Sequence, residues 1–139
     1  MCGIIGIASD KSVSSNIINS LKRLEYRGYD SAGLATLNNN LIIEKKCSGR
    51  VEQLEKIIFE NPVEGNIGIG HVRWATHGIP NTVNAHPHSS EIVSVVHNGI
   101  IENSDELKRK LEKEGVKFKS QTDTEVITFL ITKALESSD

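Results

Sequence analysis

The chain lacks the features that mark several large protein classes. Its two cysteines, Cys2 and Cys47, are too few and too far apart for a disulfide framework or a CxxC metal site. No apolar run approaches the roughly 20 residues of a membrane span, and the N-terminus lacks the basic start and long apolar core of a signal peptide. With 16 basic and 18 acidic residues, the net charge of −2 gives no signature of binding to nucleic acid or anionic membranes. We therefore expect a protein of the reducing cytoplasm, with neither nucleic acid nor membrane as a partner.

The 139 residues are enough for one domain with its own core. Apolar periodicity predicts both strands and helices, without the strict βαβ alternation of a parallel sheet. We therefore expect an α+β fold with a mainly antiparallel sheet and helical layers. A polar turn at residues 38–40 predicts a hairpin. The predicted strands are residues 2–8, 32–37, 41–46, 66–74, 92–97 and about 116–118, and the predicted helices are about 13–26, 51–58, 103–114 and 122–135.

The last predicted helix begins with Thr122-Asp123-Thr124-Glu125, which has the Thr-x-x-Glu pattern of a capping box. Its apolar residues predict one buried face. Further upstream, residues 75–91 form a long segment rich in His, Thr, Asn and Pro, which we interpret as a loop belonging to a site. The residues expected on the buried helix face are Val126, Ile127, Leu130, Ile131 and Leu135.

Cys2 is the first candidate for chemistry. Removal of Met1 would leave a chain that begins with a cysteine, carrying a thiol and a free α-amine. Such amines have pKa values of roughly 7.7–8.0, near the value that suits a general base at neutral pH. One residue would then supply both nucleophile and base. Residues so close to a terminus are otherwise often frayed, but the apolar run Ile4-Ile5-Gly6-Ile7-Ala8 predicts a buried strand from the terminus onward.

Arg73 lies where a predicted strand meets the long loop, a common position for functional side chains. It could bind a carboxylate through two parallel hydrogen bonds, or it could be a surface arginine paired with an acid. His97-Asn98-Gly99 could form an oxyanion hole from the Asn98 amide and a backbone N–H at Gly99, or a plain turn. Asp123 could hold an ammonium group, or could simply complement the dipole of the helix that follows.

The histidines are clustered: all five lie between His71 and His97. The sequence His86-Pro87-His88 raises the alternative of a zinc site. No cysteine or acidic residue stands at ligand spacing, and Pro87 fits a rigid loop equally well. We therefore predict no metal and no cofactor, and keep a histidine-ligated metal protein as an alternative.

Taken together, these groups describe one ligand. A nucleophile with its own base, an arginine for a carboxylate, an acid for an ammonium group and an oxyanion hole suit an amino acid with a reactive side-chain carbonyl. Glutamine fits this description.

The sequence resembles the class II glutamine amidotransferases, whose glutaminase domain belongs to the N-terminal nucleophile hydrolases. Among them it is most similar to the members that make glucosamine 6-phosphate from fructose 6-phosphate and glutamine. The form Tyr-Arg-Gly-Tyr-Asp-Ser-Ala-Gly at residues 26–33 favours these members over the phosphoribosyl and asparagine-forming relatives. The motifs that carry the resemblance are MCGIIG (1–6), LEYRGYDSAG (24–33), HVRWATHG (71–78), NAHPH (84–88), HNGIIEN (97–103) and TDTE (122–125).

The resemblance implies a role for each matching residue. Cys2 would be the nucleophile, its α-amine the base, and Asn98 with Gly99 the oxyanion hole. Glutamine would be bound through its α-carboxylate by Arg73 and through its α-amine by Asp123. Thr76 and His77 would also bind the substrate by lining the same pocket. Two supporting residues would complete the site: Arg27 would help to order the N-terminus, and Trp74 would belong to a loop that closes over the site.

The resemblance also implies a longer protein. We expect residues 1–139 to be a partial glutaminase domain, an α/β/β/α sandwich of mainly antiparallel sheets that is incomplete at its C-terminus. Two sugar-isomerase lobes, which would bind fructose 6-phosphate, would follow in the full-length enzyme, and a homodimer of that enzyme is compatible with the resemblance. An open sheet edge would leave the isolated chain marginally stable or self-associating. Rival interpretations are another class II amidotransferase and a non-catalytic module that binds glutamine.

Overall fold

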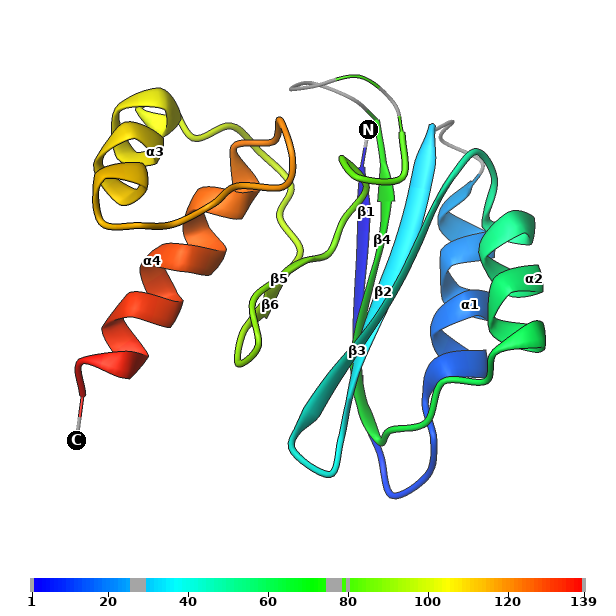
Figure 1. The fold of residues 1–139 in the computed structure, drawn as a ribbon. Helices are drawn as coiled ribbons and strands as arrows, with labels where there is room; N and C mark the ends of the chain where they lie inside the picture. Colours follow the sequence, from blue (N-terminus) through cyan, green and yellow to red (C-terminus); the bar gives the residue numbers. More distant parts are fainter. Residues whose placement is uncertain (1, 26–29, 75–78, 80, 139) are drawn as a thin grey trace.

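The computed structural model describes residues 2–25, 30–74, 79 and 81–138. This part of the chain forms successive layers of helices, sheet, sheet and helices (Figure 1). The α/β/β/α sandwich expected from the resemblance is therefore confirmed. No helix within the described ranges is long and apolar enough to cross a membrane. In layer order the elements are α1 (Ser14–Leu24) and α2 (Val51–Glu60); β1 (Gly3–Ala8), β4 (Ile67–Arg73), β2 (Ser31–Asn38) and β3 (Leu41–Ser48); β5 (His88–Ser89) and β6 (Ser94–Val95); and α3 (Ser104–Lys113) and α4 (Thr124–Glu136).

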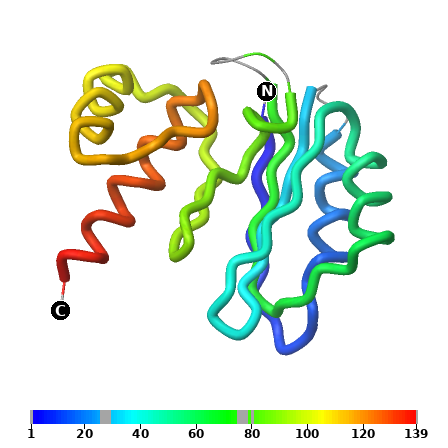
Figure 2. The backbone as a smooth tube through the Cα atoms, in the orientation of Figure 1, coloured from blue at the N-terminus to red at the C-terminus, as the bar shows by residue number. Residues whose placement is uncertain are grey.

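The larger sheet has the order β1-β4-β2-β3, and each neighbouring pair is antiparallel. The predicted hairpin joins β2 to β3, with Asn39 and Asn40 both at positive φ, 50° and 65°. Asparagine tolerates this conformation, and turns of this kind match the twist of the flanking strands. Because β1 and β4 are antiparallel, the start of β1 and the end of β4 lie at the same end of the sheet (Figure 2).

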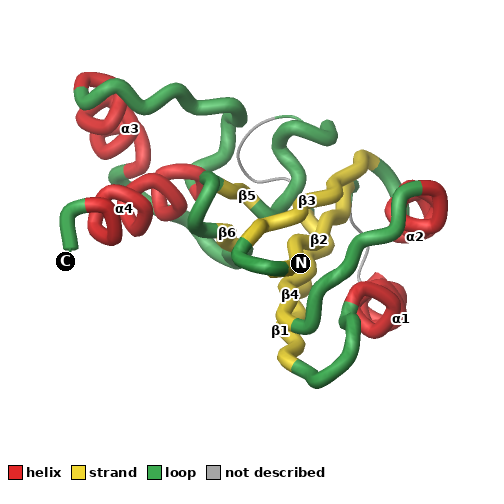
Figure 3. Tube along the Cα trace, turned by 60° about the horizontal axis from the view of Figure 1, so that its bottom comes forward, coloured by secondary structure: helices red, strands yellow, loops and turns green. Residues whose placement is uncertain are grey.

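Helices α1 and α2 cover one face of this sheet (Figure 3). The amphipathic pattern predicted for α1 is confirmed, because Ile17, Ile18 and Leu21 are buried in the core. The helix lies directly on β4 at two glycines: a Cβ at Gly68 or Gly70 would come within 2.6 or 2.5 Å of Ile17. The glycine spacing of this strand therefore makes room for α1.

The opposite face of β4 carries His71 and Arg73. Side chains alternate along a strand, so His71 and Arg73 point away from α1 and towards the second layer. Gly33 on β2 is the register partner of His71. Because Gly33 has no side chain, the backbone of His86 approaches the sheet there, and a Cβ at Gly33 would overlap the carbonyl oxygen of His86.

Gly33→Ala is expected to destabilise the protein strongly, since two backbone segments would have to separate. Overpacking of this kind costs about 1–3 kcal/mol, occasionally more, which corresponds to a fall in Tm on the order of 5–10 °C. Gly6→Ala on β1 is the matched control, because a Cβ there meets nothing within 4 Å. Thermal unfolding followed by circular dichroism measures both, and equal Tm values for the two variants would contradict the close approach.

Some predicted elements differ from the observed ones. Of the strand predicted at residues 92–97, only β6 is observed. It pairs with β5, which lies inside the segment (residues 75–91) that we interpreted as a loop. The strand predicted near Val116–Phe118 is wrong: Val116 N–H donates back to Leu111, and Phe118 packs edge-on against Phe129. The chain here closes the end of α3 and does not join a sheet.

The buried face predicted for α4 is also wrong. Its inner face is polar: Thr128 donates a hydrogen bond to the His88 carbonyl, and Thr132 bonds Ser90. Of the five apolar residues expected inside, Val126 is fully buried and Ile127 is half-buried, while the exposed fractions of Leu130, Ile131 and Leu135 are 39%, 41% and 50%. Apolar periodicity located the helix but not the side that faces the sandwich.

The predicted capping box is absent from the described residues. The helix begins at Thr124, and no side chain caps its first turn there. The Glu125 carboxylate instead accepts backbone N–H groups of Lys119 and Ser120 at 2.9 and 2.7 Å. Glu125 thus fixes the segment before α4. This segment contains Asp123.

Candidate active site

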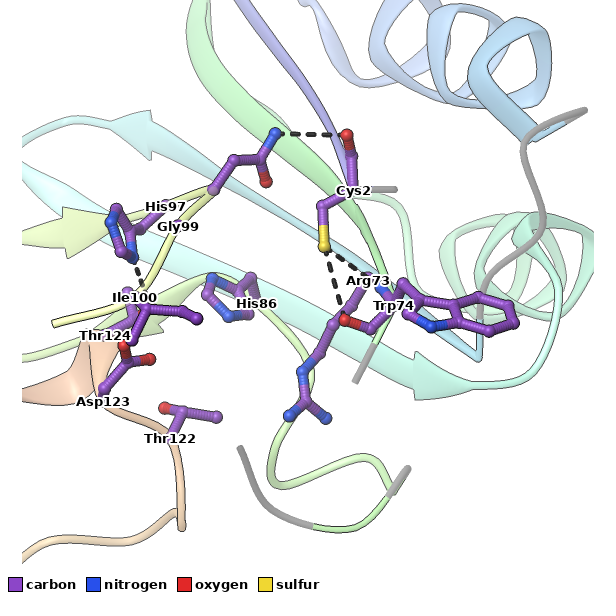
Figure 4. Close-up of a pocket in the computed structure, with 11 residues that line it drawn as sticks. Cys2, Arg73, Trp74, His86, His97, Gly99, Ile100, Thr122, Asp123 and Thr124 are labelled. Carbon is purple, nitrogen blue, oxygen red and sulfur yellow. Dashed lines mark hydrogen bonds between the residues drawn. The ribbon is translucent and has the colours of Figure 1, made fainter. Parts of the chain in front are cut away.

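A cavity of about 380 Å³ opens where the start of β1, the end of β4, the segment after β6 and the start of α4 meet (Figure 4). Its size is within the range of small-molecule sites. Six of the predicted site residues line it: Cys2, Arg73, Trp74, Asn98, Gly99 and Asp123. The other lining residues are His86, His97, Ile100, Thr122 and Thr124.

Cys2 lies at the cavity because the β1–β4 register, which pairs Gly3 with Val72, places Cys2 beside Arg73 at the end of β4. The Trp74 backbone N–H donates to the Cys2 sulfur at 3.1 Å, and the thiol lies 3.5 Å from the Trp74 carbonyl oxygen, to which it can donate. These contacts hold the Cys2 side chain at the cavity wall (Figure 4). The thiol is only partly buried, so a substrate can reach it.

Asn98 and Gly99 face Cys2 from the segment after β6. The Asn98 side-chain amide donates to the Cys2 carbonyl oxygen at 3.2 Å. An amide NH₂ has two hydrogens, so one remains for a developing oxyanion. Gly99 has φ of 140°, and a Cβ there would also come within 3.1 Å of His97 Nε2. Backbone conformation and space therefore both favour glycine at this position.

Arg73 and Asp123 bring opposite charges to the same cavity. Arg73 is 2% exposed and donates to the Ile79 carbonyl at 3.4 Å. Burial lowers the pKa of its guanidinium, while the negative charges of Asp30, of a Cys2 thiolate and of Asp123 act to raise it. The Asp123 carboxylate is 6% exposed and accepts the Ile101 N–H at 2.6 Å. A cation and an anion in the lining of one cavity suit the carboxylate and ammonium groups of an α-amino acid.

The other residues that the resemblance places in or near the site are only partly described. Trp74 lies at the cavity edge, with 54% of its side chain exposed. Arg27, Thr76 and His77 lie outside the described residues.

Three of the histidines form a buried stack between the two sheets. The rings of His71 and His86 lie parallel, 4.1 Å apart, and His88 meets His86 edge-on at 4.8 Å. Burial lowers the pKa of His71 to about 4 and that of His88 to about 3, and also lowers that of His86. The three imidazoles are therefore neutral at pH 7. Across residues 2–25, 30–74, 79 and 81–138, no group of three His, Cys, Asp or Glu side chains is arranged to hold a metal ion.

His71 is a site residue that sequence reasoning missed. Its Nε2 lies 2.9 Å from Asn98 Oδ1, which places it directly behind the predicted oxyanion hole. Strand alternation was the available signal, because a residue two positions before Arg73 faces the same side. In the sequence, His71 stands out only as one member of a histidine cluster.

Comparisons with known proteins show which family the chain resembles. The family described as glutamine amidotransferase domain matches residues 56–136. The chain is 53% identical to the glutamine–fructose-6-phosphate aminotransferase (isomerizing) of Agrobacterium fabrum, with 96% of this chain and 22% of that protein covered. It is 56% identical to the protein of the same name from Clostridium acetobutylicum, with 94% and 22% covered. The chain thus spans less than a quarter of these relatives.

Solved structures show the same similarity. The structure of the glutamine phosphoribosylpyrophosphate amidotransferase from B. subtilis, complexed with ADP and GMP, matches with a TM-score of 0.75 and 28% identity, over 96% of this chain and 29% of that one. A structure described as the allosteric regulatory enzyme of purine biosynthesis matches with a TM-score of 0.79 and 28% identity, over 96% and 30%.

Proposed function

The chain belongs to the glutamine amidotransferase family, and from this premise we propose that it hydrolyses the side-chain amide of glutamine with Cys2 as nucleophile. One observation carries the proposal: the Cys2 thiol, the Asn98 amide and the charged groups of Arg73 and Asp123 line a single cavity. Each group matches one part of glutamine or of its tetrahedral intermediate.

In the proposed reaction, the free α-amine of Cys2 takes the thiol proton after Met1 is removed, and the sulfur attacks the amide carbon. The negative oxygen that forms accepts hydrogen bonds from Asn98 and from a backbone N–H at Gly99. The C–N bond breaks, and the α-amine returns the proton to the nitrogen, which leaves as ammonia. The glutamyl group stays bound to the Cys2 sulfur as a thioester. Water then hydrolyses the thioester and releases glutamate.

Arg73 and Asp123 determine specificity in this proposal. Arg73 holds the α-carboxylate and Asp123 the α-amine, so the amide carbon is placed beside Cys2. Proximity and orientation of this kind account for a large share of catalysis. The roles of Thr76 and His77 in binding the substrate, and of Arg27 and Trp74 as supporting residues, remain predictions from the resemblance.

We further propose that the full-length protein passes the ammonia to fructose 6-phosphate and so makes glucosamine 6-phosphate. The identity to relatives named glutamine–fructose-6-phosphate aminotransferase supports this step. Sugar-isomerase lobes outside residues 1–139 would bind the sugar phosphate, and the full-length enzyme would be a homodimer. A reducing cytoplasm, which keeps the Cys2 thiol reactive, is the proposed location.

Release of glutamate and ammonia from glutamine by the purified chain tests the proposal. We expect the two products in equal amounts. Glutaramate, which lacks the α-amine, should react at least about 10-fold more slowly, because Asp123 then loses a charged partner. A folded chain that binds glutamine but releases no glutamate would contradict the proposal and favour the non-catalytic module.

A further inference from the structure

We propose that His71 is a positioning residue, which donates its Nε2–H to Asn98 and thereby fixes the orientation of the oxyanion-hole amide. This inference rests on the proposed function. The Asn98 side chain lies between two groups: its Oδ1 is 2.9 Å from His71 Nε2, and its Nδ2 donates to the Cys2 carbonyl at 3.2 Å. The histidine thus holds the end of the amide that faces away from Cys2.

The orientation matters because the two ends of an amide have opposite hydrogen-bonding roles. The NH₂ group donates and the oxygen only accepts. If the Asn98 amide rotated by half a turn, its oxygen would face the developing oxyanion and repel it. In the productive orientation of the Asn98 amide, the N–H at His71 Nε2 donates to Oδ1. In the reversed orientation that N–H would face the hydrogens of the Asn98 NH₂ group, and no hydrogen bond could form.

Burial keeps His71 in the required form. The side chain is fully buried, and its lowered pKa of about 4 leaves the ring neutral at pH 7, with a single N–H. Since Asn98 Oδ1 can only accept, that hydrogen belongs on Nε2. Nδ1 of His71 has no hydrogen-bond partner among the described residues, so no competing contact there favours the other tautomer.

The fold also prevents the ring from turning. His86 stacks on His71 with 15° between the ring planes. The His86 backbone in turn sits on Gly33, the register partner of His71. The stack between the sheets therefore holds the imidazole edge towards Asn98.

A pair of amide substitutions tests the donor directly. His71→Gln places an N–H donor about as far from the backbone as Nε2, whereas His71→Asn has the same polar group on a shorter side chain that does not reach Asn98. We expect His71→Asn to lower kcat for glutamine hydrolysis by about 10²-fold, near the loss on removing one oxyanion-hole donor. His71→Gln should retain kcat within about 5-fold, and the KM for glutamine should change less than about 3-fold in both variants.

A double-mutant cycle separates positioning from general loss of structure. If His71 acts only through Asn98, His71→Asn should have no further effect on kcat in an Asn98→Ala background. Independent losses that multiply in the double variant would overturn the proposal. Equal losses in His71→Asn and His71→Gln would overturn it as well.

The tautomer provides a readout that does not depend on activity. Nitrogen NMR of His71 at pH 7 should show the hydrogen on Nε2, and a hydrogen on Nδ1 would overturn the proposal. If the wild-type chain released no glutamate, the proposed function would fail. The tautomer, and the response of the Asn98 amide resonances to His71→Asn but not to His71→Gln, would still decide whether His71 orients Asn98.

Discussion

Cys2→Ala is expected to lower kcat for glutamine hydrolysis by at least about 10⁴-fold, as removal of a nucleophile does in other enzymes that work through a covalent intermediate. The substitution removes the sulfur that would form the thioester, while Arg73, Asn98 and Asp123 stay in place. The affinity for glutamine should therefore change little. Glutamate release gives kcat, and isothermal calorimetry gives the dissociation constant.

Cys47→Ala is the matched control, because Cys47 is the other cysteine of the chain. It is 5% exposed, and burial raises the pKa of its thiol, so it carries little thiolate at neutral pH. Its replacement should leave kcat within about 2-fold, apart from any loss of stability from the smaller side chain. A Cys2→Ala variant that kept a substantial fraction of the wild-type rate would contradict the role of Cys2 as nucleophile.

Arg73→Gln is expected to lower kcat/KM for glutamine by about 10²–10³-fold, mainly through KM. Hydrogen bonds to charged groups contribute about 1.5–3 kcal/mol each, and Arg73 can make two of them to a carboxylate. Steady-state kinetics with glutamine and with 4-aminobutanamide, which lacks the α-carboxylate, measure the effect. The wild-type chain should strongly prefer glutamine, whereas Arg73→Gln should lose most of that preference.

Arg73→Lys is the control for charge alone. It keeps the positive charge but cannot form two parallel hydrogen bonds, so its kcat/KM should lie between those of the wild type and Arg73→Gln. Because Arg73 is buried, the melting temperature of each variant must be measured as well. Loss of activity without loss of preference for the α-carboxylate would show that Arg73 does not bind that group.

The sequence predicted much of the fold because local patterns determine it. The period of the apolar residues located α1, and the asparagines between two apolar runs located the hairpin of β2 and β3. The motifs also indicated Cys2, Arg73, Asn98, Gly99 and Asp123 as members of one site, and the fold brings these five residues to one cavity.

What the sequence did not predict depends on specific polar and backbone contacts that apolar periodicity does not reveal. The inner face of α4 is formed by threonines that bond the backbone and side chains of the β5 region, and apolar periodicity gives no sign of such a polar contact. Glu125 matched a capping box but binds the turn before the helix. The stack of His71 on His86 depends on the absence of a side chain at Gly33, which only the sheet register reveals.

The most direct test asks whether Met1 is removed and whether the glutamine site is assembled. It measures the intact mass of the protein after treatment with 6-diazo-5-oxonorleucine, a glutamine analogue that alkylates the nucleophile. We predict loss of Met1 and addition of one analogue, with no adduct on Cys2→Ala. Retained Met1, or a folded chain without an adduct, would contradict the account.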